Sequence, residues 1–289
     1  MTRLRRSIRY SFHLLVVCAS LTFAQGTYIQ IDFPAAVMTE ATAINAAGDI
    51  VGIYTDDIGG HGFLLQQGVY TTIDYPGAQY SYAQGINNKG QVVGLAWPIG
   101  YVYEVETHSF APLQFPGASY TYPLAINDAG TIAGYFQEPD LTYKGFEIFE
   151  FNDEAIVPPG STDTFVTCVS ADGRLFGYAD VNNGYTAFTF RESRYGNITI
   201  SGANSPFVLG TNPAGTALVG YYEPITGVTG FAYRNGTLQP LSFPGSISTL
   251  AFGINPQGDV VGYFIDSSYA THGFLWQPPR EMTLPAESK

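Results

Sequence analysis

The sequence predicts an all-β fold, a six-bladed β-propeller with four-stranded blades, and three observations support this prediction. An eleven-residue phrase, INAAGDIVGIY at Ile44, returns as INNKGQVVGLA at Ile86, INDAGTIAGYF at Ile126 and INPQGDVVGYF at Ile254. With two weaker copies, the turn glycine of this phrase occurs six times at intervals of 40 to 43 residues, as Gly48, Gly90, Gly130, Gly173, Gly215 and Gly258. The chain also holds 33 glycines, 18 prolines, 21 tyrosines and 20 phenylalanines, a composition typical of short strands joined by tight turns.

One repeat contains four short runs with β character. In the first complete repeat they are TEATAIN from Thr39, GDIVGIYT from Gly48, HGFLLQQ from His61 and GVYTTIDYP from Gly68. Each run is bounded by Gly, Asn, Asp or Pro, and none has an apolar period that would suit a helix. The repeated N-x-x-G predicts a hairpin turn, because Asn bonds its own backbone and Gly accepts a positive φ. Four strands in about 42 residues, repeated in tandem, form one propeller blade per repeat.

A second glycine recurs inside the second run of every repeat, at Gly52, Gly94, Gly134, Gly177, Gly220 and Gly262. Glycine weakens the interior of a strand, so its recurrence suggests a close approach of neighbouring blades or backbones. Large side chains follow it, and we expect these to fill the space between blades: Tyr54, Phe136, Tyr178, Tyr222 and Phe264.

The two ends of the repeat array predict how the ring closes. The sixth repeat supplies three strands, whereas TYIQIDF, at Thr27 to Phe33, resembles a fourth strand without a blade of its own. We therefore expect this N-terminal strand to complete the last blade and to protect two open sheet edges at once. REMTLPAES, which begins at Arg280, is the alternative fourth strand.

The first 24 residues have the pattern of a secretory signal peptide, since several arginines precede an apolar stretch from Phe12 to Ala24 that is too short to anchor in a bilayer. We expect residues 25–280 to form the propeller and residues 281–289 a C-terminal tail. This predicts a secreted protein, extracellular or periplasmic, with no membrane contact after cleavage. Loss of four arginines would leave 8 basic and 24 acidic side chains, which argues against nucleic acid as a partner.

Cysteine provides no disulfide framework. Cys18 lies in the expected signal peptide, so Cys168 alone remains in the exported chain. It is predicted to be a small buried apolar residue rather than a nucleophile, because its own repeat contains no histidine. The core must then hold the fold together, and we expect a monomer.

Three linked motifs carry a family resemblance. HGF occurs at His61 and His272, with KGF at Lys144, TGF at Thr229 and TAF at Thr186, and these stand in order with the GIN-x-x-G phrase and a PGA turn. Over almost the whole exported chain, this pattern resembles the HAF-type extracellular repeat of exported bacterial proteins. Repeat two departs from it, with YVYEVE at Tyr101. The resemblance implies an exported repeat protein and implies no reaction.

No catalytic motif is present, neither a G-x-S-x-G elbow, nor H-E-x-x-H, nor a phosphate loop, so no catalytic residue and no cofactor is predicted. His61 and His272 occupy equivalent repeat positions. They could share a metal ion, but packing or hydrogen bonding explains them as well, and no metal site is predicted from them. Calcium remains an alternative, for which Asp56-Asp57 is the best single candidate.

A set of acidic residues follows the second strand of most repeats: Asp56, Glu138, Asp180, Glu223 and Asp266. The loops after the second strand open on the same propeller face as the loops that lead into each blade, so these acids should share one face. They either cap turns and keep the surface soluble or form a ring that binds a cation or ligand.

The loops that lead into each blade are aromatic. GAQYSYAQ contains Tyr80 and Tyr82, and GASYTYPL contains Tyr120 and Tyr122, with Trp97 expected nearby. Phe165 and Phe207 follow in later repeats. These rings either line a groove on which sugar rings or peptide side chains stack, or pack between blades.

The sequence therefore predicts an exported, non-catalytic binding module. Its ligand, a glycan as first choice and a peptide or protein as second, would occupy the face built from the loops that lead into the blades. A glycoside hydrolase or lyase that uses facing carboxylates of the acidic set is one alternative. A structural or adhesive surface protein is the other.

Overall fold

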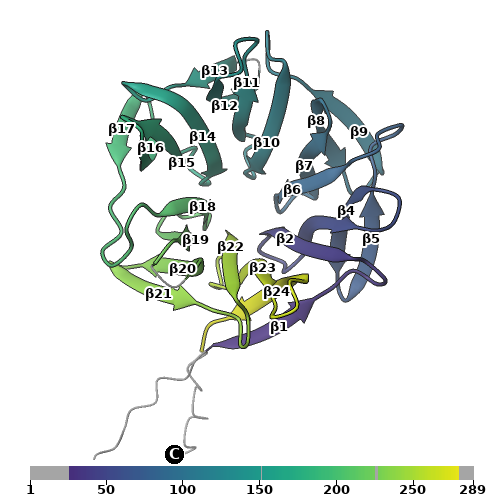
Figure 1. The fold of residues 1–289 in the computed structure, drawn as a ribbon. Helices are drawn as coiled ribbons and strands as arrows, with labels where there is room; N and C mark the ends of the chain where they lie inside the picture. The colour runs from purple at the N-terminus through teal and green to yellow at the C-terminus, as the bar shows by residue number, and fades with distance from the viewer. Residues whose placement is uncertain (1–25, 151, 225–226, 280–289) are drawn as a thin grey trace, which may run out of the picture.

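The computed structural model describes residues 26–150, 152–224 and 227–279, and it confirms the predicted six-bladed β-propeller (Figure 1). Six four-stranded antiparallel sheets stand around a common axis, and the described residues contain no helix, hence none that could span a membrane. The expected signal peptide, residues 1–24, and the C-terminal tail, residues 281–289, lie outside the described residues.

Each blade runs from an inner strand next to the axis to an outer strand at the rim. Blade 1 comprises β2 (Met38–Ile44), β3 (Ile50–Thr55), β4 (Gly60–Gln66) and β5 (Val69–Ile73). Blade 2 comprises β6 (Tyr82–Ile86), β7 (Gln91–Ala96), β8 (Ile99–Glu104) and β9 (Ser109–Leu113), and blade 3 comprises β10 (Tyr120–Ile126), β11 (Ile132–Gln137), β12 (Tyr143–Phe149) and β13 (Asn152–Ile156). Blade 4 comprises β14 (Ser161–Val169), β15 (Leu175–Val181), β16 (Tyr185–Arg191) and β17 (Arg194–Asn197), and blade 5 comprises β18 (Phe207–Thr211), β19 (Ala217–Tyr222), β20 (Thr229–Arg234) and β21 (Thr237–Leu241). Blade 6 comprises β22 (Ser248–Ile254), β23 (Val260–Ile265), β24 (Thr271–Gln277) and β1 (Thr27–Ile31).

The N-terminal strand closes the ring, as predicted. β1 pairs antiparallel with β24, from Thr27 opposite Gln277 to Ile31 opposite Gly273, so purple and yellow ribbons share one blade in Figure 1. His272 Nδ1 adds a 3.0 Å contact to the Asp32 carboxylate just beyond β1. The alternative strand at Arg280 lies outside the described residues, and the fourth place in blade 6 belongs to β1.

The N-x-x-G turns are hairpins, as predicted, and they also tie blades together. Asn45 Oδ1 accepts the amides of Ala47 and Asp49, and Gly48 has a φ of +87°. The Asn45 Nδ2 donates to the carbonyl of Asn87 in the next blade at 3.4 Å. Equivalent bonds join Asn87 to Asn127 (3.1 Å) and Asn127 to Ser170 (2.9 Å). Each of these three turns therefore satisfies a backbone group of its neighbour as well as its own.

The glycine inside the second strand meets its own blade, not the neighbouring one. A Cβ on Gly52 would lie 2.0 Å from the carbonyl oxygen of Glu40 on β2 and 2.6 Å from the ring of Phe63 on β4. Glu40 precedes a β-bulge at Thr42, which recurs in the inner strand of every blade. The expected contact between blades is thus corrected. The glycine leaves room for the inner strand's backbone and for an aromatic ring.

Repeat two keeps this aromatic ring despite its divergent sequence. Tyr101 pairs with Gly94 as Phe63 pairs with Gly52. Ile99-Gly100-Tyr101 therefore stands where the other repeats have HGF or its variants.

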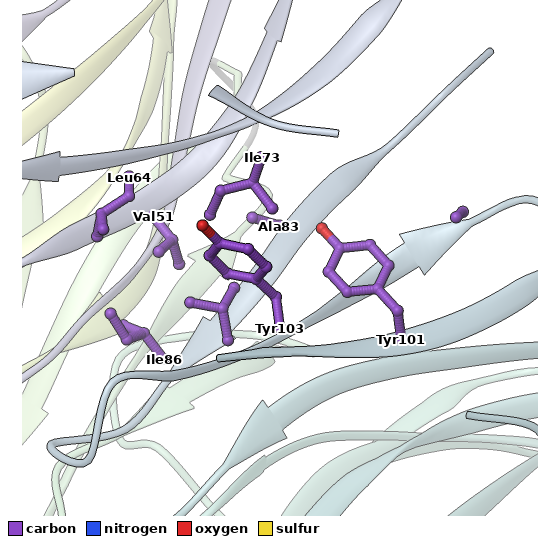
Figure 2. Packing of buried hydrophobic residues seen from close by; sticks show 9 residues of the cluster. Val51, Leu64, Ile73, Ala83, Ile86, Tyr101 and Tyr103 are labelled. Atoms are coloured by element: carbon purple, nitrogen blue, oxygen red, sulfur yellow. The ribbon is translucent and has the colours of Figure 1, made fainter. Parts of the chain in front are cut away.

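The hydrophobic core is divided into clusters between adjacent blades. Between blades 1 and 2, Val51, Leu64 and Ile73 meet Ala83 and Tyr101, and Figure 2 shows Tyr101 and Tyr103 beside these aliphatic groups. Four of the large residues expected between blades do lie there: Tyr54, Phe136 and Phe264 are buried in such clusters, and the half-buried Tyr222 packs against another. Burial of apolar faces on both sides of each sheet holds neighbouring blades together.

Closure by β1 predicts a strong dependence of stability on Ile31. This side chain is 5% exposed and packs in the cluster between blades 6 and 1. We expect Ile31→Ala to reduce the free energy of unfolding by about 3 kcal/mol, because it leaves a cavity at the closing strand. Ile29→Ala on the same strand, where the side chain is 43% exposed, should cost less than about 1 kcal/mol. Urea denaturation measures both, and equal losses would contradict the assigned burial.

A turn glycine missing from one repeat gives a second prediction. Ala35 has a φ of +64°, whereas glycine holds the equivalent turn position elsewhere, as Gly77 does with +82°. The left-handed conformation costs a non-glycine residue about 1–2 kcal/mol, more than the backbone entropy that glycine loses. Ala35→Gly should therefore stabilise the protein by about 0.5–1 kcal/mol, and Gly77→Ala should destabilise it by about 1 kcal/mol. Thermal unfolding that moves both variants in one direction would refute this explanation.

Candidate functional site

Two kinds of loop form one face of the propeller, which we call the loop face. One kind connects second to third strands, and the other connects the outer strand of a blade to the inner strand of the next. In blades 1 and 2 they touch: a parallel bridge joins Gly60 to Tyr80, and the Ser81 amide donates to the Gly60 carbonyl at 2.9 Å. The opposite face carries the N-x-x-G hairpins and is called the turn face.

The five predicted aromatic residues come together on the loop face. Tyr80, Tyr82, Leu95 and Trp97 line a cleft of about 340 Å³. The Trp97 ring lies 4.5 Å from that of Tyr120 and 5.9 Å, edge on, from that of Tyr122, measured between ring centroids. We call these six side chains the aromatic cleft.

The sequence places Trp97 at the edge of this cleft by a tight connection. β7 ends at Ala96 and β8 begins at Ile99, so the short turn holds the indole above the blade instead of within it. Trp97 is 55% exposed and Tyr80 44%, so large apolar surfaces face solvent side by side. Exposed clusters of large apolar side chains usually mark a contact site on a protein surface.

Aromatic side chains continue from this cleft around the loop face. Tyr122 stacks on Tyr135 with ring centroids 4.6 Å apart, and Tyr135 meets Phe165 of blade 4 edge on at 5.0 Å. The same alternation continues through Tyr178, Phe207 and Tyr221 in blades 4 and 5. The resulting arc of rings covers the loop face from blade 2 to blade 5.

The arc follows from strand register. Each inner strand presents one residue at the same level, and together these form the inner ring: Glu40, Tyr82, Tyr122, Phe165, Phe207 and Leu250. Their partners on the second strands form the outer ring: Ile53, Leu95, Tyr135, Tyr178, Tyr221 and Tyr263. Sequence reasoning missed Tyr135, Tyr221 and Tyr263 and assigned Tyr178 to the space between blades. The available signal was a tyrosine directly after the second-strand glycine in four repeats.

Glu40 is the one charged side chain in the two rings, and sequence reasoning missed it as well. Burial raises the pKa of Glu40 from 4.5 to about 7. Its charge in turn contributes to raised pKa values of Tyr82 and Tyr263, for which burial is the larger cause. Among the described residues, no hydrogen-bond donor or cation pairs with the Glu40 carboxylate.

Below the two rings, two cavities follow each other along the propeller axis, and we call them together the channel. The bulge residues, such as Thr42 and Gln84, line a cavity of about 90 Å³ two residues further along each inner strand. A second cavity of about 90 Å³ opens at the turn face among Asn45, Asn87 and Asn127. Thr42 donates its hydroxyl to the Ala83 carbonyl of the next blade at 2.9 Å, so part of the channel wall is already hydrogen-bonded.

The predicted acidic residues share the loop face, but two of them serve their own loops. Asp56 Oδ1 accepts the amides of Ile58 and Gly59, and Asp266 Oδ1 accepts those of Ser268 and Ala270. These bonds lower the pKa of both carboxyl groups, with the Ile58 amide the first cause for Asp56 and the Ser268 hydroxyl for Asp266. Turn capping, one of the two sequence interpretations, therefore explains this pair.

The other three acids have separate environments. Glu138 forms a 2.8 Å ion pair with Lys144, and Glu223 is exposed in its loop. Asp180 lies one residue before the end of the second strand of blade 4, and its Oδ1 is buried without a hydrogen-bond partner among the described residues. The acids thus surround the loop face individually, and they do not meet as one ligand set.

The two motif histidines are explained by packing and hydrogen bonding. His61 stacks on Tyr54 and contacts Asp74 at 3.0 Å and Asp56 at 3.3 Å, and His272 stacks on Phe264 between Asp32 and Asp266. Each imidazole therefore ties a loop to the outer strand of its blade. No group of three His, Cys, Asp or Glu in the described ranges is arranged to hold a metal, Asp56-Asp57 included. Cys168 is buried, and burial raises the pKa of its thiol to about 12, as suits a packing residue.

The described carboxylates are divided evenly between the two halves of the propeller, eleven in each, whereas the described basic side chains are not. Strand direction assigns eleven carboxylates of the described residues to the loop-face half: Asp32, Glu40, Asp56, Asp57, Asp74, Glu138, Asp140, Asp163, Asp180, Glu223 and Asp266. Lys144 is the one basic side chain described there. Five others lie in the turn-face half: Lys89, Arg174, Arg191, Arg194 and Arg234. The loop face is therefore strongly negative and attracts cations.

Comparisons with known proteins support the fold. No protein-family model matches the sequence, and no match is found among curated proteins. TolB from Acinetobacter baumannii is 8% identical over 84% of this chain, with a TM-score of 0.57, and this chain covers 64% of that one. A gluconolactonase from Xanthomonas campestris is 11% identical, with 89% and 91% of the two chains covered and a TM-score of 0.55. The Aleuria aurantia lectin, in complex with Fucα1-6GlcNAc, is 12% identical, with 83% and 92% covered and a TM-score of 0.51. At these identities the similarity shows a shared propeller fold.

The raised pKa of Glu40 predicts a specific pH dependence of stability. In the unfolded chain the carboxyl ionises near pH 4.5, and in the folded protein near 7, so the folded state binds more protons between these values. The free energy of unfolding should therefore fall by about 2 kcal/mol relative to Glu40→Gln as the pH rises from 4.5 to 7. Urea denaturation of both proteins across this range measures the difference. A difference that does not change with pH would contradict the assigned environment.

Proposed function

We propose that this propeller is an exported carbohydrate-binding module whose ligand occupies the aromatic cleft between blades 2 and 3. The observation that carries the proposal is the exposed Trp97 indole, which lines a cleft of about 340 Å³ with Tyr80 and Tyr82. Its ring also contacts Tyr120 and Tyr122 of blade 3. The apolar faces of sugar rings stack on aromatic rings, and the phenolic hydroxyls at the edge can bond sugar hydroxyls.

The position of the cleft supports a binding role. Its side chains come from three strands of blades 2 and 3, from the turn after β7 and from the loop before β6, which a parallel bridge ties to Gly60. A site that is largely formed before the ligand arrives loses little conformational entropy on binding. The lectin similarity is consistent with a glycan ligand. The apolar stretch at residues 12–24 and the resemblance of the repeats to the HAF type support export.

Two alternative functions are less well supported by these contacts. A glycosidase or lyase would use two carboxyl groups that face each other, whereas Asp56 and Asp266 cap turns and Glu138 is paired with Lys144. A peptide or protein ligand could also use the aromatic cleft. The test below separates it from a glycan by the ligand that binds.

The proposal predicts that Trp97 determines glycan binding. We expect the mature protein to bind oligosaccharides on a glycan array, and Trp97→Ala to reduce the affinity for the best ligand at least tenfold, about 1.4 kcal/mol, because it removes the stacking surface. Isothermal titration calorimetry measures the affinity.

The matched control is Tyr269→Ala, which removes another exposed aromatic side chain, 81% exposed, from the loop between β23 and β24 in blade 6. This variant should bind the glycan like the wild type. Absence of any glycan ligand, or equal binding by Trp97→Ala and wild type, would refute the proposal.

A further inference from the structure

A second feature of the loop face lies beside the aromatic cleft and shares Tyr82 with it. Glu40 is the only charged residue among the twelve positions of the inner and outer rings, and it lies on β2 in blade 1. Leu250 and Ile53 are the apolar ring members nearest to it by register and blade order, and Tyr82 and Tyr263 are the nearest aromatic ones. One carboxylate therefore stands in a wall of aromatic and aliphatic groups.

Among the residues that the structure describes, none places a compensating charge beside Glu40. The strands that pack against β2 are β3 and β24 on blades 1 and 6, β6 on blade 2, and β22 and β23 on blade 6. The titratable groups that face Glu40 from them are the hydroxyls of Tyr82 and Tyr263, both neutral at physiological pH. A charged group left without a partner in a partly buried place is costly, unless a cation from outside pairs with it.

The side chains around Glu40 indicate which kind of ligand would bind there. Tyrosine faces carry negative electrostatic potential, and a carboxylate among such faces attracts an ammonium group that has aliphatic substituents. A strongly hydrated ion such as sodium would gain little from the rings, whereas an alkylated ammonium contacts them directly. The eleven carboxylates of the loop-face half, with Lys144 as the one described basic residue there, attract such a cation from a distance.

We propose that the loop-face mouth of the channel is a binding site for a small organic cation of the alkylammonium class, with Glu40 as its counter-charge and Tyr82 and Tyr263 as its aromatic walls. Glu40 lies two residues before Thr42 on the same strand, so the site is next to the cavity lined by Thr42 and Gln84, on its loop-face side. The cation would therefore lie over the channel without having to enter it. Its charge contact is on blade 1, whereas Trp97 and its cleft lie between blades 2 and 3.

The test uses choline as the probe and its neutral isostere, 3,3-dimethylbutan-1-ol, as the ligand control. Titration calorimetry or NMR chemical shifts at pH 8 should detect choline binding to the wild type and at least tenfold weaker binding of the isostere. Glu40→Gln, which keeps the shape and removes the charge, should weaken choline at least tenfold. Tyr263→Leu should weaken it severalfold. The melting temperature and circular dichroism of each variant verify that it is folded.

Asp57→Asn is the matched protein control. It removes one carboxylate from the same face, but Asp57 is exposed in its loop and stands outside the rings. Choline affinity of this variant should stay within twofold of the wild type. Equal choline affinity in Glu40→Gln and the wild type, or equal affinity of the wild type for choline and the isostere, would overturn the proposal, as would no detectable choline binding.

Protonation gives a second readout that a purely structural role of Glu40 would not produce. The cation pairs with ionised Glu40, so wild-type affinity should rise between pH 5.5 and 8, and this rise should vanish in Glu40→Gln.

Amino sugars test one natural source of the cation. Glucosamine should bind more tightly than N-acetylglucosamine, because the nitrogen of the latter is neutral. Because Trp97→Ala should leave choline binding intact, failure of the glycan proposal and failure of this one give different results.

Discussion

The pairing of β1 with β24 is the contact on which the rest of the structure depends. A chain of repeats can stack as an open array or close into a ring, and only the ring hides the first and last sheet edges from solvent. Here the first described strand fills the fourth place of the last blade, and His272 and Asp32 add a contact across the junction. Closure sets the distances among all six inner strands, and so determines which side chains meet at the axis.

The two faces of the ring serve different purposes. On the turn face, Asn side chains bond their own hairpins and the carbonyls of neighbouring blades, so most of their hydrogen-bonding capacity supports the fold. On the loop face, connections differ between repeats in length and sequence, and Trp97 and Tyr80 remain exposed. The hydrogen bonds that the repeated turns make between blades therefore lie on the turn face, and residues of the loop face can vary and form a binding site.

Aromatic groups and carboxylates divide the loop face between them. The rings form a continuous arc from blade 2 to blade 5, while Glu40 stands where this arc is interrupted in blade 1. Most of the other acids are engaged in caps or ion pairs, which fixes loop shape and contributes a negative field. Shape and stacking in the cleft, and charge at the channel mouth, would then select different parts of a ligand.

The sequence alone determined the number of blades, the strands of each blade and the turns between them, because a 42-residue period and the glycine and asparagine positions are local signals. It also identified the aromatic residues of the cleft, since Tyr80, Tyr82, Tyr120 and Tyr122 lie in the loops that lead into blades 2 and 3 or at the start of the strands that follow, and the face of these loops follows from the fold. It could not identify Glu40 or Tyr263 as candidate site residues, because their roles depend on side chains that are close to them only in the folded structure. These residues lie more than 200 positions apart in the chain, and only closure of the ring brings their blades side by side. Burial then changes the acid–base behaviour of an otherwise ordinary glutamate, and burial is a property of the tertiary structure.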